Sequence, residues 1–377
     1  MDEPIRKLDY LFRHALLRDA AYDLQLPADK SRLHGLALKL IENFHPDAQR
    51  DQLAAELAEH AQRSGDPALQ EALLAYTWRA ARFAHAKHDP AALRWFDQAA
   101  ALEPDPSKKA QALQLAADQL LTTGSAGQAG SRLAQALELA VAAGDVKLQA
   151  SVIHKQAVTQ YVLGGFTEAE SLLNEALALA RAAGETETEA MAITNMAGLQ
   201  RMRGKREEAF ALQKQALELY RASGNRRGES VALGNICVYL SDVGQPLEAL
   251  ACAEEAFKVA TETDNRRTAG IVRGNVGMIL NGLGRLAEAE ASYAAALTLH
   301  RSVYNRPYEG YDRCRYALVL LRQGNEQAAR KEWRRGHEMT LAYGDASDRE
   351  VELQDMRQTC AQEGVAPFDD DVVSARI

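Results

Sequence analysis

The sequence predicts an all-α fold made of helix pairs stacked in tandem. Three observations support this fold class: the chain repeats every 40 residues, each repeat holds two amphipathic segments with helical spacing, and a glycine separates the two segments. One glycine column runs through six repeats without a gap, at Gly124, Gly164, Gly204, Gly244, Gly284 and Gly324. Six tandem units are therefore predicted over residues 103–342.

Residues 185–224 illustrate one unit. Apolar residues recur at three-to-four spacing in two runs, first at Ala190, Ile193, Met196, Ala197 and Leu199, then at Ala209, Leu212, Ala216, Leu217 and Leu219. Such spacing places the apolar side chains on one face of a helix. Gly204 lies between the runs and can adopt the left-handed conformation that ends a helix. Each unit is therefore predicted to be a helix hairpin.

Two alanine columns keep the same period. They are Ala129, Ala169, Ala209, Ala249, Ala289 and Ala329, and Ala136, Ala176, Ala216, Ala256 and Ala296, with Gly336 in the sixth place of the second column. Two antiparallel helices approach to about 8 Å only where the side chains at the crossing are small. Because one hairpin cannot bury its apolar face alone, stacking of the hairpins creates the core.

A last glycine column, expected at the ends of the units, weakens toward the C-terminus. It reads Gly144, Gly184, Gly224, Asp264, Tyr304 and Gly344. Two of the six positions therefore lack the residue that ends a helix most readily.

Composition narrows the functional classes. The 377 residues are 47% hydrophobic and 25% charged, which is typical of a folded protein. A net charge of −8 argues against a direct nucleic-acid partner, since such binding neutralises phosphates with basic residues. No apolar stretch is long enough to cross a membrane, residues 1–4 lack the features of a signal peptide, and the four cysteines form no CxxC pair. We expect a cytoplasmic protein with reduced thiols and no membrane contact.

No motif for catalysis, metal binding or cofactor binding is present. The chain has no GxxxxGK[ST] phosphate loop, and the string HEMTL at His337 carries Leu341 where a zinc-binding HExxH motif needs its second histidine. No GxSxG motif appears. We therefore expect a non-enzymatic protein with no catalytic residue, no metal and no cofactor.

A glycine followed five residues later by alanine and seven further by alanine resembles the tetratricopeptide repeat (TPR). The 40-residue period resembles the long-helix variety found in kinesin light chains, although the aromatic positions of the family are mostly aliphatic in this chain. The resemblance implies a right-handed α-solenoid of tandem TPR hairpins that binds a protein or peptide partner. By the same spacing, residues 49–102 are expected to form degenerate hairpins and residues 343–364 a capping helix, followed by a disordered acidic tail over 365–377.

The N-terminal segment carries a second, shorter resemblance. Residues 1–48 resemble the end of the winged-helix segment that follows the ATPase core in signal-transduction ATPases with numerous domains (STAND ATPases). The matching residues are Phe12, Arg13, His14, Leu16, Arg18, Tyr22, Leu26, Pro27, Arg32 and His34. This resemblance implies an ATPase module upstream. The alternative is an ordinary helical cap of the repeats.

The TPR resemblance also implies a ligand groove lined by the first helix of each hairpin. The groove positions of the family fall on Lys155, Thr194, Asn195, Arg201, Asn235, Ser241, Asn275 and Asn281, with Arg315 as a further cation. Three of them form an asparagine column with 40-residue spacing, and each amide offers a donor and an acceptor to a peptide backbone. The alternatives are that each asparagine bonds a neighbouring helix and that each cation pairs with a nearby carboxylate.

The sequence thus predicts a protein- or peptide-binding domain, used as the sensor or regulatory arm of a signalling ATPase or a transcription regulator. The cations of the groove favour a partner segment with acidic groups. A free-standing peptide sensor or scaffold, an arm that binds a small-molecule inducer, and an enzyme accessory arm remain as alternatives.

Overall fold

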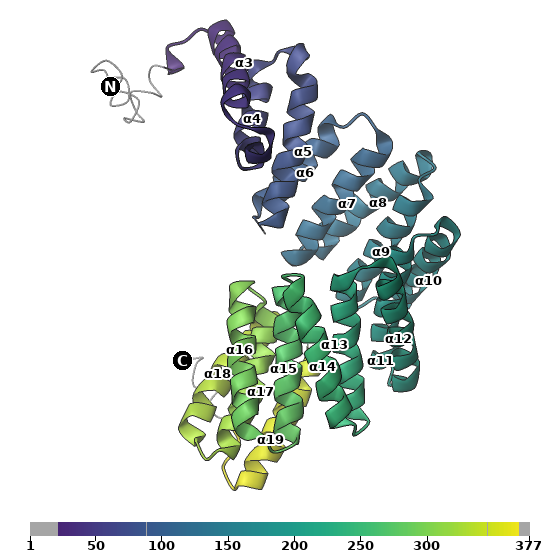
Figure 1. Cartoon of the computed structure of the whole chain (residues 1–377), viewed down its shortest axis with the longest axis vertical. Helices are drawn as coiled ribbons and strands as arrows, with labels where there is room; N and C mark the ends of the chain where they lie inside the picture. Colours follow the sequence, from purple (N-terminus) through teal and green to yellow (C-terminus); the bar gives the residue numbers. More distant parts are fainter. Residues whose placement is uncertain (1–21, 88, 345, 369–377) are drawn as a thin grey trace, which may run out of the picture. The chain divides into compact units, whose positions relative to one another are not determined.

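The computed structural model describes residues 22–87, 89–344 and 346–368, with side chains 346–348 left aside (Figure 1). Seventeen α-helices, α3 to α19, follow one another in these ranges, and no strand occurs among them. The predicted all-α class with tandem helix hairpins is therefore confirmed. The chain divides into two compact units, 1–179 and 180–377, with the boundary inside one helix.

The first unit contains four helix pairs, α3/α4 to α9/α10. Its helices are α3 (Pro27–Phe44), α4 (Arg50–Ser64), α5 (Gln70–Ala86), α6 (Ala91–Leu102), α7 (Pro106–Thr122), α8 (Ala126–Ala142), α9 (Val146–Val162) and α10 (Phe166–Ala183), with short 3-10 turns η1 (Asp47–Gln49) and η2 (Pro67–Leu69). The unit boundary falls in α10. Proline at the first position starts α3 and α7, where its missing N–H costs no hydrogen bond.

The second unit continues the pattern with four more hairpins and a last helix. Its helices are α11 (Thr186–Met202), α12 (Arg206–Ser223), α13 (Arg226–Asp242), α14 (Pro246–Glu262), α15 (Arg266–Gly282), α16 (Leu286–Ser302), α17 (Arg306–Arg322), α18 (Glu326–Tyr343) and α19 (Ala346–Glu363). Asparagine side chains cap two first helices: Asn225 accepts from the Gly228 N–H at 2.8 Å, and Asn265 accepts from the Thr268 N–H at 3.3 Å.

The turns within the hairpins follow the glycine column. Gly204, for example, has φ +76° and ends α11, and the other five glycines of that column also have positive φ. In the weaker column, Asp264 (φ +48°) and Tyr304 (φ +52°) keep the left-handed conformation without glycine. The fold therefore imposes a strained backbone at these two residues.

The alanine columns lie at the helix crossings, as predicted. Every member of the two columns is fully buried except Ala209, which is 6% exposed. Gly336, the one departure from alanine, has a specific cause: a Cβ there would lie 2.8 Å from the backbone nitrogen of Cys314 and 2.8 Å from the carbonyl oxygen of Gly310. Helices α17 and α18 thus approach too closely even for a methyl group.

The N-terminal expectation is only partly described. Phe12, Arg13, His14, Leu16 and Arg18 lie outside the described residues, and the winged-helix resemblance is not confirmed. The described part is a helix hairpin, because α3 packs against α4 and buries Leu38. The boundary predicted between residues 48 and 49 consequently falls inside a helix pair rather than between two segments.

At the C-terminus, α19 lies within the range expected for the capping helix. The disordered tail predicted over residues 365–377 is wrong for its first four residues. Phe368 is fully buried: its ring lies 6.3 Å from that of Trp333, and its N–H donates to Met356 Sδ at 3.1 Å. The buried Phe368 ring thus attaches this stretch to the core. None of the described helices has the length and apolar character needed to cross a bilayer.

Substitution at a helix crossing tests the repeat register. We expect Ala209→Leu to destabilise the protein by about 1–3 kcal/mol, because the extra carbon atoms overpack a buried crossing. Ala211→Leu, at an exposed position of the same helix, serves as the control and leaves stability unchanged. Urea unfolding measures both; equal effects of the two variants would contradict the proposed crossing.

A substitution at the strained turn of Tyr304 should stabilise the protein, in contrast to Ala209→Leu. Tyr304 is 79% exposed, so its ring contributes little packing, while its left-handed backbone costs about 1–2 kcal/mol relative to glycine. We expect Tyr304→Gly to raise the free energy of unfolding by about 0.5–1 kcal/mol, after the entropic cost of glycine is subtracted. Tyr304→Ala is the control, because it removes the ring and retains the strain. A melting temperature that rises equally in both variants would argue against relief of strain.

Candidate binding groove

The asparagine column occupies equivalent places on three first helices of the second unit, but its members differ in environment. Asn235 on α13 is exposed, and its side chain makes no hydrogen bond to any described residue. Asn275 on α15 is half-buried, and its Nδ2 lies 3.8 Å from Cys237 Sγ on α13. Asn195 on α11 is half-buried and interacts within the protein. The alternative left open by the sequence, that the asparagine bonds a neighbouring helix, therefore applies to Asn275.

Two of the predicted cations pair with carboxylates on the neighbouring first helix. In the first unit, Lys155 Nζ on α9 lies 2.9 Å from an Asp118 carboxylate oxygen on α7. In the second unit, Arg315 Nε on α17 donates to Glu352 Oε1 on α19 at 2.8 Å. Close packing of successive first helices thus brings each of these cations to an internal acid, which is the alternative left open by the sequence, and their role in ligand binding stays a prediction.

Among four further groove residues, two have side chains that form hydrogen bonds within the protein and two do not. Asn281 Oδ1 accepts from Arg322 Nη1 on α17 at 3.0 Å, and Thr194 Oγ1 donates to the carbonyl oxygen of Ala190 at 2.9 Å. Arg201 is exposed and Ser241 is half-buried, and neither side chain bonds to another described residue. The predicted groove residues with unused polar groups are thus Arg201, Asn235 and Ser241, and all three lie on α11 and α13.

A buried polar cluster surrounds Arg315. Burial raises the pKa of the Glu352 carboxyl to about 7, against the attraction of Arg315 and with added repulsion from Asp355 and Asp312. Glu352 Oε2 has no hydrogen-bond partner in the described part of the chain. The hydroxyl of Tyr293 is likewise buried without a partner. The cluster holds α19 against α17 at an electrostatic cost. It could not be predicted from the sequence, because its charged residues are far apart along the chain.

Two cysteines of the second unit are partly or fully buried. Burial raises the pKa of Cys237 to about 12 and that of Cys252 to about 11, so both remain neutral thiols at physiological pH. Across the described ranges, no three His, Cys, Asp or Glu side chains gather in the arrangement of a metal site.

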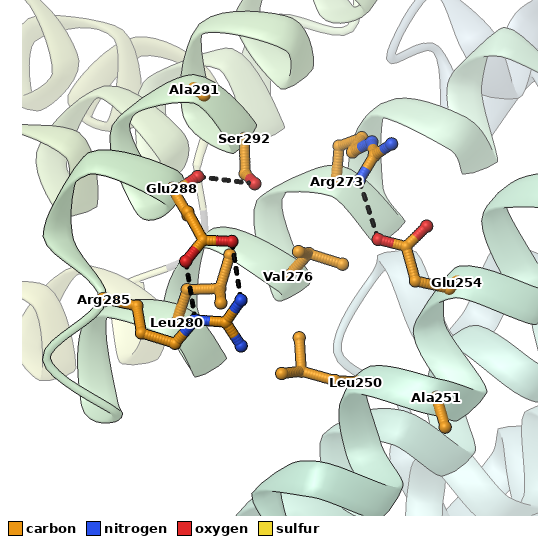
Figure 2. Close-up of a pocket in the computed structure, with 10 residues that line it drawn as sticks. All are labelled: Leu250, Ala251, Glu254, Arg273, Val276, Leu280, Arg285, Glu288, Ala291 and Ser292. Carbon is orange, nitrogen blue, oxygen red and sulfur yellow. Dashed lines mark hydrogen bonds and ion pairs between the residues drawn. The ribbon is translucent and has the colours of Figure 1, made fainter.

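The second unit also contains a hollow that none of the predicted groove residues lines. It has a volume of about 440 Å³ and is formed by α14, α15 and α16. Figure 2 shows Leu250 and Val276 between two ion pairs, Arg273–Glu254 and Arg285–Glu288. The sequence signal for this hollow is that Leu250 and Val276 stand 40 residues from the aromatic residues Phe210 and Tyr316.

Comparison with known protein families identifies the repeats. Family models described as tetratricopeptide repeat match residues 148–222, 187–262 and 272–307. These segments are tetratricopeptide repeats. The TPR is a protein-binding repeat fold, and neither matching description belongs to a catalytic family. No curated protein matches the chain in sequence.

Solved structures resemble the chain in fold. Aspartyl phosphate phosphatase F from Bacillus subtilis has a TM-score of 0.58 at 14% identity and covers 88% of this chain and 89% of its own. A Rap protein in complex with Competence and Sporulation Factor has a TM-score of 0.57 at 12% identity, over 90% of this chain and 98% of that one. At these identities, the likeness to the TPR proteins shows the fold alone.

A third structure adds a different context. It is a STAND protein with a tetratricopeptide repeat sensor from Pyrococcus horikoshii, with a TM-score of 0.52 at 15% identity. The match covers 92% of this chain and 57% of that protein. The chain therefore spans little more than half the length of that STAND protein.

The raised pKa of the Glu352 carboxyl makes the stability of the protein depend on pH. The pKa of Glu352 is higher in the folded protein than its ordinary value of 4.5. Its contribution to the free energy of unfolding is therefore fully present below about pH 4.5 and is lost as the pH rises through about 7. We expect the free energy of unfolding to fall more steeply between about pH 5 and 8 in the wild type than in Glu352→Gln. Glu350→Gln, at an exposed position of α19, is the control. Parallel pH profiles for wild type and Glu352→Gln would contradict the assignment.

Proposed function

We propose that the chain binds an extended segment of a protein or peptide partner along α11 and α13 of the second unit. The observation that carries the proposal is the unused state of Asn235 in a column whose other two asparagines, Asn195 and Asn275, interact within the protein. A polar group that faces no internal partner is available to a ligand, whereas a group already bonded must first give up its partner.

The chemistry of the two helices suits a peptide backbone with an acidic side chain. The Asn235 amide can donate to a peptide carbonyl oxygen and accept from a peptide N–H without reading the ligand's side chains. Arg201 is exposed and unpaired among the described residues, so its guanidinium can bind a carboxylate in a bidentate manner. Neighbouring first helices of such hairpins are spaced by roughly 8–10 Å, which corresponds to about three residues of extended chain.

We further propose that this binding serves regulation: the chain acts as the sensor arm of a signalling ATPase or a transcription regulator in the cytoplasm. The fold-level likeness to a STAND protein with a TPR sensor supports this context. Two TPR-like relatives of comparable similarity, a Rap protein bound to Competence and Sporulation Factor and an aspartyl phosphate phosphatase, support a role in signalling by analogy. The partner ATPase module would be either part of the same polypeptide or a separate protein.

A peptide library tests the binding proposal. Random 12-residue peptides displayed on phage are selected against the whole chain, and the enriched peptides are synthesised with a fluorescent label. We expect Asn235→Ala to weaken their binding by about 1–3 kcal/mol, because one peptide group loses its partner. We expect Arg201→Ala to reduce chiefly the association rate and its salt dependence.

Matched controls separate the groove from a general effect. Asn174→Ala on α10 and Arg267→Ala on α15 remove the same side-chain types at exposed positions without a hydrogen bond to described residues, and both should leave affinity unchanged. Enriched peptides that bind all four variants as tightly as the wild type would rule out α11 and α13 as the recognition surface.

A further inference from the structure

The hollow formed by α14, α15 and α16 has the make-up of a small binding pocket. Its floor is apolar, with Leu250 from α14 and Val276 and Leu280 from α15, and the floor lies between two ion pairs (Figure 2). Its volume of about 440 Å³ falls within the range of roughly 300–1,000 Å³ typical of ligand pockets. Apolar walls with a few fixed polar groups are the usual composition of such sites.

The 40-residue register shows which side chains stand at the equivalent places in the neighbouring repeats. In the preceding repeat, the position of Leu250 is taken by Phe210, whose ring stacks on Tyr239 with centroids 4.0 Å apart. In the following repeat, the position of Val276 is taken by Tyr316, whose hydroxyl donates to Glu290 Oε1 at 3.1 Å. Each neighbouring repeat therefore carries an aromatic ring at one of these two positions, whereas this repeat carries the aliphatic Leu250 and Val276 at them.

The two ion pairs at the rim of the hollow indicate what charge a ligand there should carry. Arg273 Nη1 lies 3.0 Å from Glu254 Oε1, and its guanidinium lies 4.0 Å above the ring of Phe257, so this wall is held on two sides. On the other wall, Arg285 bonds both oxygens of Glu288 at 2.7 and 2.6 Å, and these hydrogen bonds keep the pKa of Glu288 below its ordinary value. Each rim charge is balanced, so charge complementarity favours an uncharged occupant.

The pocket is separate from the asparagine column. On α15, successive residues are about 100° apart around the helix axis, so Val276 and Asn275 project in different directions. None of the predicted groove residues lines the hollow. A ligand in the hollow consequently need not contact α11 or Asn235.

We propose that this hollow binds the aromatic side chain of a partner peptide, which takes the place that Phe210 and Tyr316 occupy in the neighbouring repeats. The ring packs on Leu250, Val276 and Leu280, and the N–H groups of Arg273 and Arg285 not used by their carboxylates face the peptide carbonyl groups beside it. The site is an anchor additional to the binding surface proposed on α11 and α13.

Ligand-observed NMR tests this site in the whole chain with N-acetyl-L-phenylalaninamide as the probe. The wild type should give saturation transfer strongest at the ring protons and a measurable affinity, and N-acetyl-L-alaninamide should give none. Leu250→Phe and Ala291→Phe each place a ring of the protein itself in the hollow and should weaken probe binding about tenfold or more, because the probe loses its apolar contact area. The position of Leu250 already carries phenylalanine in the preceding repeat, so the substitution suits the fold.

Two controls make the outcome decisive. Leu341→Phe adds a ring at an exposed position of α18 and should leave binding unchanged. Asn235→Ala should also leave probe binding unchanged, so failure of the groove proposal and failure of this one can be told apart. Wild-type-like binding in both folded filling variants, or equal binding of the alanine probe, would overturn the proposal.

Discussion

The close crossing of two helices at small side chains is the constraint on which the rest of the structure depends. Alanine at two places in each hairpin lets the helices approach, and Gly336 replaces it where even a methyl group would meet backbone atoms of α17. Once the hairpins close in this way, their first helices also come within reach of one another. Ion pairs such as Arg315–Glu352 form across that second contact.

This packing decides which polar groups remain for a partner. Two long cations on first helices pair with a carboxylate on a neighbouring first helix: Lys155 with Asp118, and Arg315 with Glu352. Arg201 and Asn235 have no such partner among the described residues. The recognition surface of such a repeat protein is therefore the set of groove residues left over after the repeats have been joined.

The sequence predicted the fold well because a period of 40 residues is a local property that needs no knowledge of contacts. It predicted the groove less well, since whether Asn275 or Arg315 is free depends on residues of another hairpin, whose distance the sequence does not contain. Burial of Phe368 was missed for the same reason: the Trp333 and Met356 that receive it belong to other helices. The hollow beside Leu250 was visible only as an absence of aromatic residues within the register.

The side-chain amide of Asn235 gives the most direct measurement of the central claim. In protein labelled with ¹⁵N at asparagine, its two amide protons can be followed while a selected peptide is added. The account predicts that the Asn235 amide signals shift as the peptide saturates, while those of Asn174 stay in place. A peptide that binds fully without moving the Asn235 amide would contradict it.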